Sequence, residues 1–186
     1  MSGRFGIGLV GLGRHGSRYA RHLLEGIPGC HLAAVSRRDV GAGRAFAEQH
    51  GLLFMPEWRE LVTCKEVEAV VVVTPPALSR EICLAAVRAG KPLLIEKPLA
   101  LTVADAQEMV RAAREAGITL MTAQTLRFTP VLARLRDRLA DIGLLEYLVL
   151  TMRADRPSHR WLGDPVQAGG GVLLEIGIHL LDSSVF

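Results

Sequence analysis

Three glycines at G-x-G-x-x-G spacing, Gly11, Gly13 and Gly16, stand between an apolar run and a helix-like segment. The tight turn off a strand uses the freedom of Gly11, and the missing side chain of Gly13 lets a pyrophosphate approach the main chain. Gly16 allows the helix to pack closely on the strand, and free N–H groups at the helix start face the phosphates. The turn, which also carries Arg14 and His15, predicts a dinucleotide-binding site, with a purely structural turn as the alternative.

Ser36, Arg37 and Arg38 follow the second apolar run, where such a fold meets the adenosine ribose. An acidic residue there binds the ribose hydroxyls and favours NAD, but no acid follows this run until Asp39. A hydroxyl and two guanidinium groups suit a 2′-phosphate, because arginine binds phosphate through paired hydrogen bonds. We therefore expect NADP as the cofactor, with NAD as the alternative; solvated surface charge is the other explanation of the arginines. The missing acid also disfavours a methyltransferase that binds S-adenosylmethionine with this turn.

Two further segments come directly after apolar runs: Thr74-Pro75-Pro76 and Glu96-Lys97-Pro98. Ligands of open α/β sheets bind at the carboxyl ends of strands, so both segments are candidates for cofactor contact. Lys97 there could donate a hydrogen bond or a proton to a substrate oxygen, and Glu96 could bind a ribose or orient Lys97. A strand-ending turn and a solvated loop are the structural alternatives.

Strand-like and helix-like segments alternate along the chain and would position these motifs. The apolar, β-branched runs predict strands over 7–10, 31–35, 68–73, 92–95 and 118–122. The segments between and after them predict helices over 17–24, 39–50, 56–61, 78–89 and 102–117. This β-α alternation predicts an α/β fold with a doubly wound parallel sheet and right-handed crossovers.

The alternation ends near Gln124, where we place the boundary between a dinucleotide-binding domain over 1–123 and a second domain over 124–186. A basic helix is expected from Pro130 and a strand over 144–153. A loop over 154–171 and a final apolar helix over 172–186 follow.

Composition excludes several other classes of protein. The 186 residues are 49% hydrophobic and carry a net charge of +3, without a dense basic stripe that would bind nucleic acid. No apolar run is long enough to span a membrane, and the start of the chain lacks the apolar core of a signal peptide. Three separated cysteines and no metal-ligand spacing indicate a reduced, metal-free, cytoplasmic protein.

Several motifs occur together and in order: G-L-G-R-H-G at 11–16, V-V-V-T-P-P at 71–76, A-G-K-P-L-L-I-E-K-P-L-A at 89–100, L-R-F-T-P at 126–130 and G-G-G-V-L-L-E-I-G-I-H-L-L-D at 169–182. With this set the whole chain resembles the Gfo/Idh/MocA family of NAD(P)-dependent oxidoreductases. The resemblance implies a Rossmann domain followed by an α+β domain that often forms the oligomer interface. It also implies hydride transfer to or from a sugar, cyclitol or related small molecule.

The resemblance also assigns catalytic residues. Lys97 takes the place of the lysine in the family's E-K-P motif, and His179 that of the acid/base histidine, a role that suits an imidazole. Glu175 stands where the family usually has an aspartate, and on an α-helix it would share one face with His179. Ser79 stands where many members have a histidine, so it is not a predicted site residue.

Members of the family are roughly twice as long as this chain, as two full domains require. The strands that would complete the second domain are not in this sequence, so we expect six apolar residues to have few partners: Val172, Leu173, Leu180, Leu181, Val185 and Phe186. A non-catalytic dinucleotide-binding fragment or an inactive truncated product is therefore the alternative to an enzyme. A homo-oligomer formed through the second domain, or a complementary C-terminal part, is the expected macromolecular partner.

Overall fold

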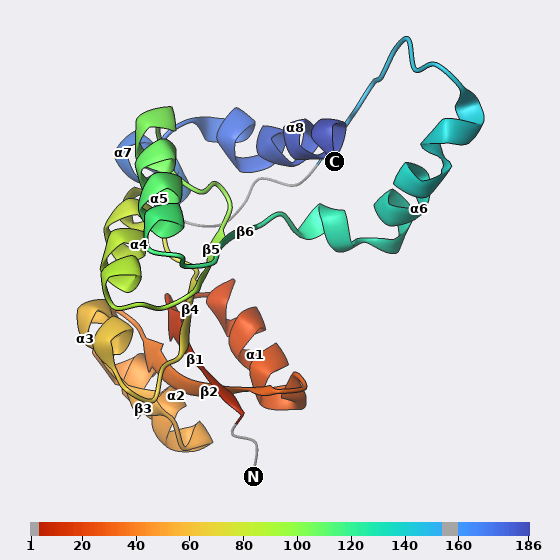
Figure 1. Cartoon of the computed structure of the whole chain (residues 1–186). Helices are drawn as coiled ribbons and strands as arrows, with labels where there is room; N and C mark the ends of the chain where they lie inside the picture. Colours follow the sequence, from red (N-terminus) through yellow and green to blue (C-terminus); the bar gives the residue numbers. More distant parts are fainter. Residues whose placement is uncertain (1–3, 154–159) are drawn as a thin grey trace. The chain divides into compact units, whose positions relative to one another are not determined.

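The computed structural model describes residues 4–153 and 160–186, which form two compact units, Met1–Thr122 and Ala123–Phe186 (Figure 1). The first unit carries a six-stranded sheet in the order β3-β2-β1-β4-β5-β6. Its strands are β1 (Phe5–Val10), β2 (Cys30–Ser36), β3 (Leu53–Phe54), β4 (Ala69–Val72), β5 (Leu93–Glu96) and β6 (Leu120–Ala123). The pairings from β3 across to β5 are all parallel. The predicted doubly wound sheet is confirmed, with β3 as a short addition.

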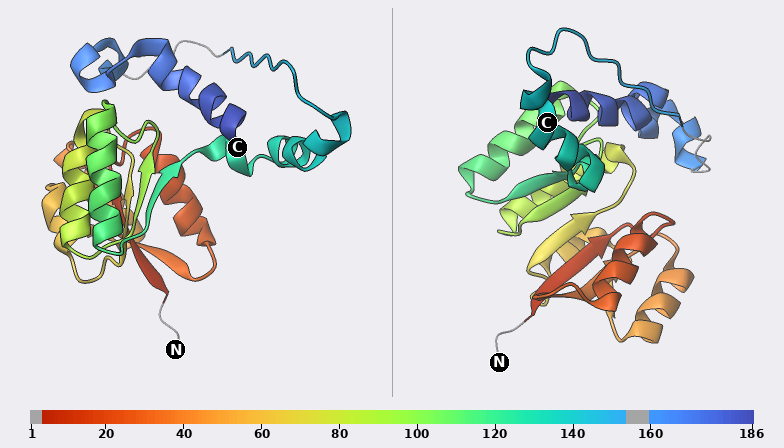
Figure 2. Two further views of the ribbon diagram at one scale, coloured as in Figure 1. Left: turned by 45° about the horizontal axis from the view of Figure 1, so that its top comes forward. Right: turned by 90° about the vertical axis from the view of Figure 1, so that its right-hand side faces the viewer.

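Helices cover both faces of this sheet (Figure 2). They are α1 (Gly16–Gly26), α2 (Val40–His50), α3 (Trp58–Thr63), α4 (Ser79–Arg88) and α5 (Val103–Glu115). Local chemistry fixes where several begin. Asp39 caps the N-terminus of α2, because its carboxylate accepts a hydrogen bond from Ala42 N at 3.0 Å. Thr102 caps α5 in the same way, with its hydroxyl accepting from Asp105 N at 3.1 Å.

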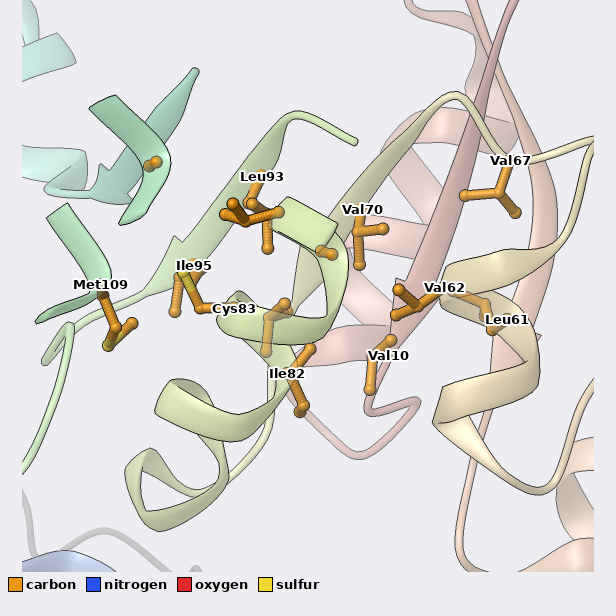
Figure 3. Close-up of a cluster of buried hydrophobic side chains, with 14 of the residues drawn as sticks. Val10, Leu61, Val62, Val67, Val70, Ile82, Cys83, Leu93, Ile95 and Met109 are labelled. Atoms are coloured by element: carbon orange, nitrogen blue, oxygen red, sulfur yellow. The ribbon is translucent and has the colours of Figure 1, made fainter. Parts of the chain in front are cut away.

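The core lies in two layers because alternate strand residues point to opposite faces. Val70 and Val72 of β4 pack with α3, α4 and α5, whereas Val71 packs with α1 and α2. Figure 3 shows the first layer, where Ile82 of α4 is fully buried. Burial on both faces explains why β4 consists of an unbroken run of alanine and valines.

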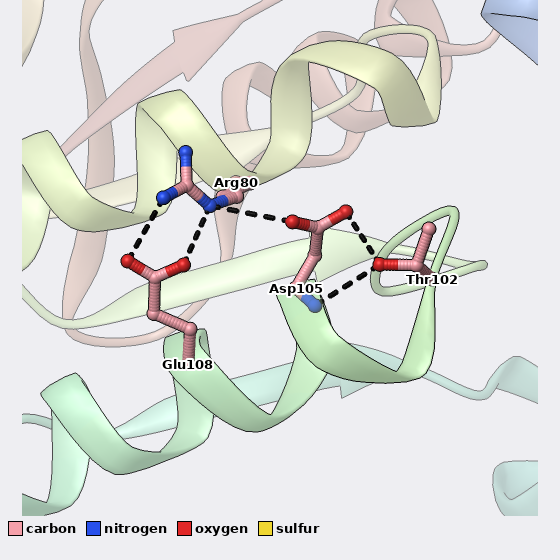
Figure 4. A network of polar contacts seen from close by, with 4 residues as sticks. All are labelled: Arg80, Thr102, Asp105 and Glu108. Atoms are coloured by element: carbon pink, nitrogen blue, oxygen red, sulfur yellow. Dashed lines mark hydrogen bonds and ion pairs between the residues drawn. The ribbon is translucent and has the colours of Figure 1, made fainter.

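An ion-pair network joins the outer surfaces of α4 and α5 (Figure 4). The Arg80 guanidinium donates to both carboxylate oxygens of Glu108, at 2.7 and 2.9 Å, and lies 3.3 Å from the Asp105 carboxylate. The Thr102 hydroxyl donates to Asp105 at 2.7 Å, and the ion pair of Asp105 with Arg80 ties this start of α5 to α4.

The second unit is mainly helical, with α6 (Pro130–Arg138), α7 (Pro165–Ala168) and α8 (Ile178–Val185). The predicted strand over 144–153 is wrong: these residues have no regular structure, and Leu144 and Tyr147 are exposed. A strand needs a neighbour to take up its backbone hydrogen bonds, and the described residues after Ala123 contain no strand to provide one. The predicted loop over 154–171 contains α7 and a short 3-10 turn, Arg160–Gly163, while 154–159 lie outside the described residues.

The final helix is present as predicted, but it includes a π-helical turn, Leu173–Gly177, before α8. Asp182 of α8 accepts two hydrogen bonds from the Arg127 guanidinium, at 2.8 and 2.6 Å. Val172, Leu173, Leu181 and Val185 are exposed, as expected from the sequence, whereas Leu180 and Phe186 are half-buried. In the described parts of the chain, every helix is too short or too polar to cross a bilayer.

Candidate functional site

The glycine turn joins the end of β1 to the start of α1, and its glycines meet three different surroundings. Gly11 has a φ of 98°, and a Cβ on it would lie 2.3 Å from the Val73 carbonyl oxygen. A Cβ on Gly16 would lie 1.9 Å from the Gly11 carbonyl oxygen, so α1 begins directly against the turn. A Cβ on Gly13 would meet no atom within 4 Å. The exposed side of the turn therefore leaves Gly13 accessible to a ligand.

The end of β2 is bonded to this turn through main-chain groups. Gly11 N and Leu12 N both donate to the Ser36 carbonyl oxygen, at 3.0 and 3.2 Å. Arg37 and Arg38 follow immediately, with Arg37 3.8 Å from the Asp39 carboxylate and Arg38 exposed. The two arginines therefore directly follow Ser36, the residue whose carbonyl oxygen binds the turn.

The Ser36 side chain lies differently from its expected place beside a phosphate. The residue is 4% exposed, and its hydroxyl donates to the Pro56 carbonyl oxygen at 3.3 Å. Its visible contribution to the turn is therefore made by its main-chain carbonyl, and contact between its hydroxyl and a cofactor stays a prediction.

The end of β4 also reaches the glycine turn. Val73 N donates to the Val10 carbonyl oxygen at 2.8 Å, so the residue that follows, Thr74, lies beside the turn. The Thr74 hydroxyl oxygen is buried and has no hydrogen-bond partner among the described residues. A buried hydroxyl without a partner is costly, so this atom is suited to a ligand or a water beside the turn. Pro75 precedes a 3-10 turn that starts at the buried Pro76.

The end of β5 carries a carboxylate that three groups hold in place. Glu96 Oε1 lies 2.7 Å from His15 Nε2 and accepts from the Tyr19 hydroxyl at 2.6 Å. Glu96 Oε2 accepts from Lys97 N at 3.1 Å. The rings of His15 and Tyr19 meet edge to face, with centroids 5.7 Å apart. The ends of β2, β4 and β5 therefore all converge on the turn at the end of β1.

Glu96 is largely buried, and burial alone would raise the pKa of its carboxyl group. Hydrogen bonds from His15 and Tyr19 and the charge of His15 outweigh burial, so the pKa of Glu96 lies below its usual value. The group is a carboxylate that can only accept hydrogen bonds, so His15 Nε2 is the donor of this pair. Burial and the bond to Glu96 both raise the pKa of Tyr19, which keeps its hydroxyl a donor.

Tyr19 was not among the residues predicted from the sequence. The signal available was its place four residues after His15, because such residues are neighbours on a helix. The sequence does not show that both point toward the end of a strand 77 residues further along the chain.

Two predicted residues, Glu175 and His179, belong to the second unit. Glu175 lies in the π-helical turn Leu173–Gly177 and His179 in the first turn of α8, so the expected helix is not α-helical throughout, and their shared face stays a prediction. Both residues are half-buried. Within residues 4–153 and 160–186, no three His, Cys, Asp or Glu side chains are grouped to hold a metal ion.

Comparison with known proteins gives a consistent result. The model of the Gfo/Idh/MocA group, described as an oxidoreductase family with an NAD-binding Rossmann fold, matches residues 5–124. A 1,5-anhydro-D-fructose reductase of Ensifer adhaerens is 39% identical over 163 residues, which are 85% of this chain and 49% of that protein. An inositol 2-dehydrogenase of Saccharopolyspora erythraea is 38% identical over 123 residues, or 65% of this chain and 36% of that protein.

Solved structures agree with these relatives. GenD2 from gentamicin A biosynthesis, in complex with NAD, superposes with a TM-score of 0.86 at 29% identity, covering 97% of this chain and 52% of that one. A Synechocystis biliverdin reductase, in complex with biliverdin and NADP+, gives a TM-score of 0.80 at 25% identity, covering 98% of this chain and 58% of that one. The chain spans about half the length of the proteins it matches.

Proposed function

Because this chain belongs to the Gfo/Idh/MocA family of oxidoreductases, we propose that its glycine turn binds NADP(H), with NAD(H) as the alternative. We further propose that the protein transfers a hydride to or from a hydroxyl or carbonyl carbon of a sugar, cyclitol or similar small molecule. The observation that carries the proposal is the convergence of the ends of β2, β4 and β5 on the glycine turn. Ligands of doubly wound sheets bind where the strand order reverses, which here is beside β1.

Two features of the turn fit a dinucleotide. The open side of Gly13 leaves room for a pyrophosphate against the main chain, at the N-terminal end of α1. The buried Thr74 hydroxyl offers a polar partner at the edge of the same turn. Both features concern binding, and neither depends on the second unit.

The preference for NADP rests on the end of β2. Arg37 and Arg38 leave the sheet from Ser36, whose carbonyl oxygen holds the turn. The first acid, Asp39, accepts the hydrogen bond that caps α2, so its carboxylate already has a partner. Two guanidinium groups beside an engaged carboxylate favour the 2′-phosphate of NADP over the ribose hydroxyls of NAD.

In the proposed reaction the bound dinucleotide gives or takes the hydride. Lys97 donates a hydrogen bond to the reacting oxygen of the substrate and so polarises it. His179 exchanges the proton of that oxygen, and the Glu175 carboxylate orients the substrate. The second unit is then the start of a substrate and oligomerisation domain, through which the chain associates with a second copy or with a complementary C-terminal part.

Binding of NADPH and of NADH, followed by nicotinamide fluorescence, tests the cofactor assignment. Replacing Arg37 and Arg38 together with glutamine should weaken NADPH binding at least about tenfold and leave NADH binding nearly unchanged, because only NADPH carries the extra phosphate. Arg44→Gln on α2 is the matched control for loss of charge. The proposal fails if neither dinucleotide shows saturable binding. Equal weakening of both in the double variant would remove the preference for NADP.

Turnover of a panel of sugars and cyclitols with NADP+ or NADPH tests the reaction. Activity that disappears in Lys97→Ala while NADPH binding persists supports the enzyme. Saturable binding without any turnover supports the alternative, a non-catalytic dinucleotide-binding fragment or an inactive truncated product.

A further inference from the structure

We propose that Tyr19 is a positioning residue: with His15 it holds the Glu96 carboxylate, which fixes the segment bearing Lys97 against the glycine turn. The catalytic meaning of this clamp rests on the role proposed above for Lys97, whereas the clamp itself is a property of the first unit alone. It couples the cofactor-binding turn to the end of β5 through one side chain.

The contacts of Glu96 carry this inference. Its Oε1 takes two short hydrogen bonds from the start of α1, from His15 Nε2 at 2.7 Å and from the Tyr19 hydroxyl at 2.6 Å. Its Oε2 takes the main-chain N–H of Lys97 at 3.1 Å. One carboxylate thus bridges a helix and a strand end that are far apart in the sequence. Charge-assisted bonds of this kind are about twice as strong as neutral ones.

The same contacts decide between the two roles that the sequence left open for Glu96. Both of its oxygens already have protein partners, and the side chain is only 11% exposed. A carboxylate so engaged has little capacity left for a ribose hydroxyl. Its surroundings favour orientation of the Lys97 segment over contact with the cofactor.

The electrostatic surroundings of the cluster give the clamp a measurable signature. His15 and Tyr19 face the carboxylate from α1, the main chain of Lys97 faces it from β5, and Arg18 acts on Tyr19 from the next position of the helix. Because hydrogen bonds from His15 and Tyr19 lower the pKa of Glu96, removing the Tyr19 hydroxyl should raise it toward its ordinary value of 4.5. A residue that only filled space would not change this pKa.

The test follows the carboxyl carbon of Glu96 by NMR in the whole chain, without cofactor, with selectively 13C-labelled glutamate. Glu96→Gln assigns the signal. Tyr19→Phe keeps the ring and removes the hydroxyl, and Tyr147→Phe is the matched control because that tyrosine is 84% exposed. We expect the pKa of Glu96 to rise in Tyr19→Phe and to stay unchanged in Tyr147→Phe. The amide signal of Lys97 should follow the titration of Glu96 in the wild-type chain.

An unchanged Glu96 titration in Tyr19→Phe, or a Lys97 amide insensitive to it, overturns the clamp whether or not the protein binds a dinucleotide. If Tyr19→Phe does not fold, His15→Gln provides the same comparison, with His22→Gln on the exposed side of α1 as its control. Where turnover is measurable, Tyr19→Phe should lower kcat about tenfold, the effect of one lost hydrogen bond, and change the Kd of NADPH less than about threefold. An equal loss in both constants contradicts a positioning role.

Discussion

At the scale of single residues, the first contact of α1 with the turn is made without side chains. Gly16 lies so close to the Gly11 carbonyl oxygen that any Cβ would overlap it. Gly13, three residues earlier, faces open space. Gly16 therefore allows α1 to pack closely against the turn, whereas Gly13 leaves the main chain of the turn accessible to a ligand.

Gly16→Ala should lower the free energy of unfolding by about 1–3 kcal/mol, because the added methyl group forces main-chain atoms apart. Urea denaturation of the two chains measures the difference. Gly41→Ala in α2 is the control, since a Cβ there meets only the Asp39 carboxylate at 3.8 Å. Equal stability of Gly16→Ala and the wild-type chain would contradict the close packing.

Residue types and spacing predicted the glycine turn and pointed to the strand ends around it. They did not predict Tyr19, nor that the Ser36 hydroxyl turns to Pro56, because both depend on partners distant in sequence. The roles of the predicted cofactor and catalytic residues remain predictions.

At the scale of elements, α4 has one face that packs in the core and one that forms ion pairs at the surface. Ile82 is fully buried against β4 and β5, whereas Arg80 lies outside and pairs with Glu108 of α5. The pKa of Glu108 lies below its usual value through the hydrogen bond from Arg80, but exposed pairs of this kind are screened by solvent.

Ile82→Ala should therefore cost about 2–5 kcal/mol of the free energy of unfolding, the range for a large apolar side chain removed from a packed core. Arg80→Gln should change stability little, and its small effect should vanish in about 1 M salt, where the screening length is ~3 Å. Chemical denaturation at low and high salt compares the two variants. If Arg80→Gln lowers the free energy of unfolding more than Ile82→Ala does, the buried face of α4 is not the one that contributes most to stability.

Elements with a strong local signal were predictable from the sequence. The β-branched run of β4 and the capped start of α5 both appear where expected. The segment over 144–153 has the composition of a strand but not the structure, since composition cannot supply a neighbouring strand. The two-residue β3 was missed because a strand this short carries no periodic signal.

At the scale of the whole molecule, ionisable groups limit stability at both ends of the pH range. The pKa of Glu96 is lowered in the folded state, so its contribution is present above about 4.5 and is lost as the pH falls through the folded value. Burial raises the pKa of Cys83 from 9.0 to about 11, and that of Tyr19 is raised as well. Their contributions are present below their ordinary values and are lost as the pH rises. The lowered pKa of Lys91 acts in the opposite sense.

The free energy of unfolding should be greatest between about pH 5 and pH 9 and should fall on either side. Urea denaturation across this range measures the profile. Tyr19→Phe should reduce the fall on the alkaline side, since the variant has no phenol to ionise on unfolding. If stability keeps rising above pH 9, the deprotonation of Lys91, whose pKa is lowered in the folded state, outweighs the ionisation of Cys83 and Tyr19.

The anchoring of the glycine turn to β2 has a consequence for how this protein can evolve. The two hydrogen bonds that join the turn to β2 both end on the main-chain carbonyl of Ser36, so the side chains at 37 and 38 take no part in them. These two positions can be exchanged without loosening the turn. At the proposed cofactor site, a change of preference between NADP and NAD should therefore be open to mutation at little cost to the fold, in nature or by protein engineering.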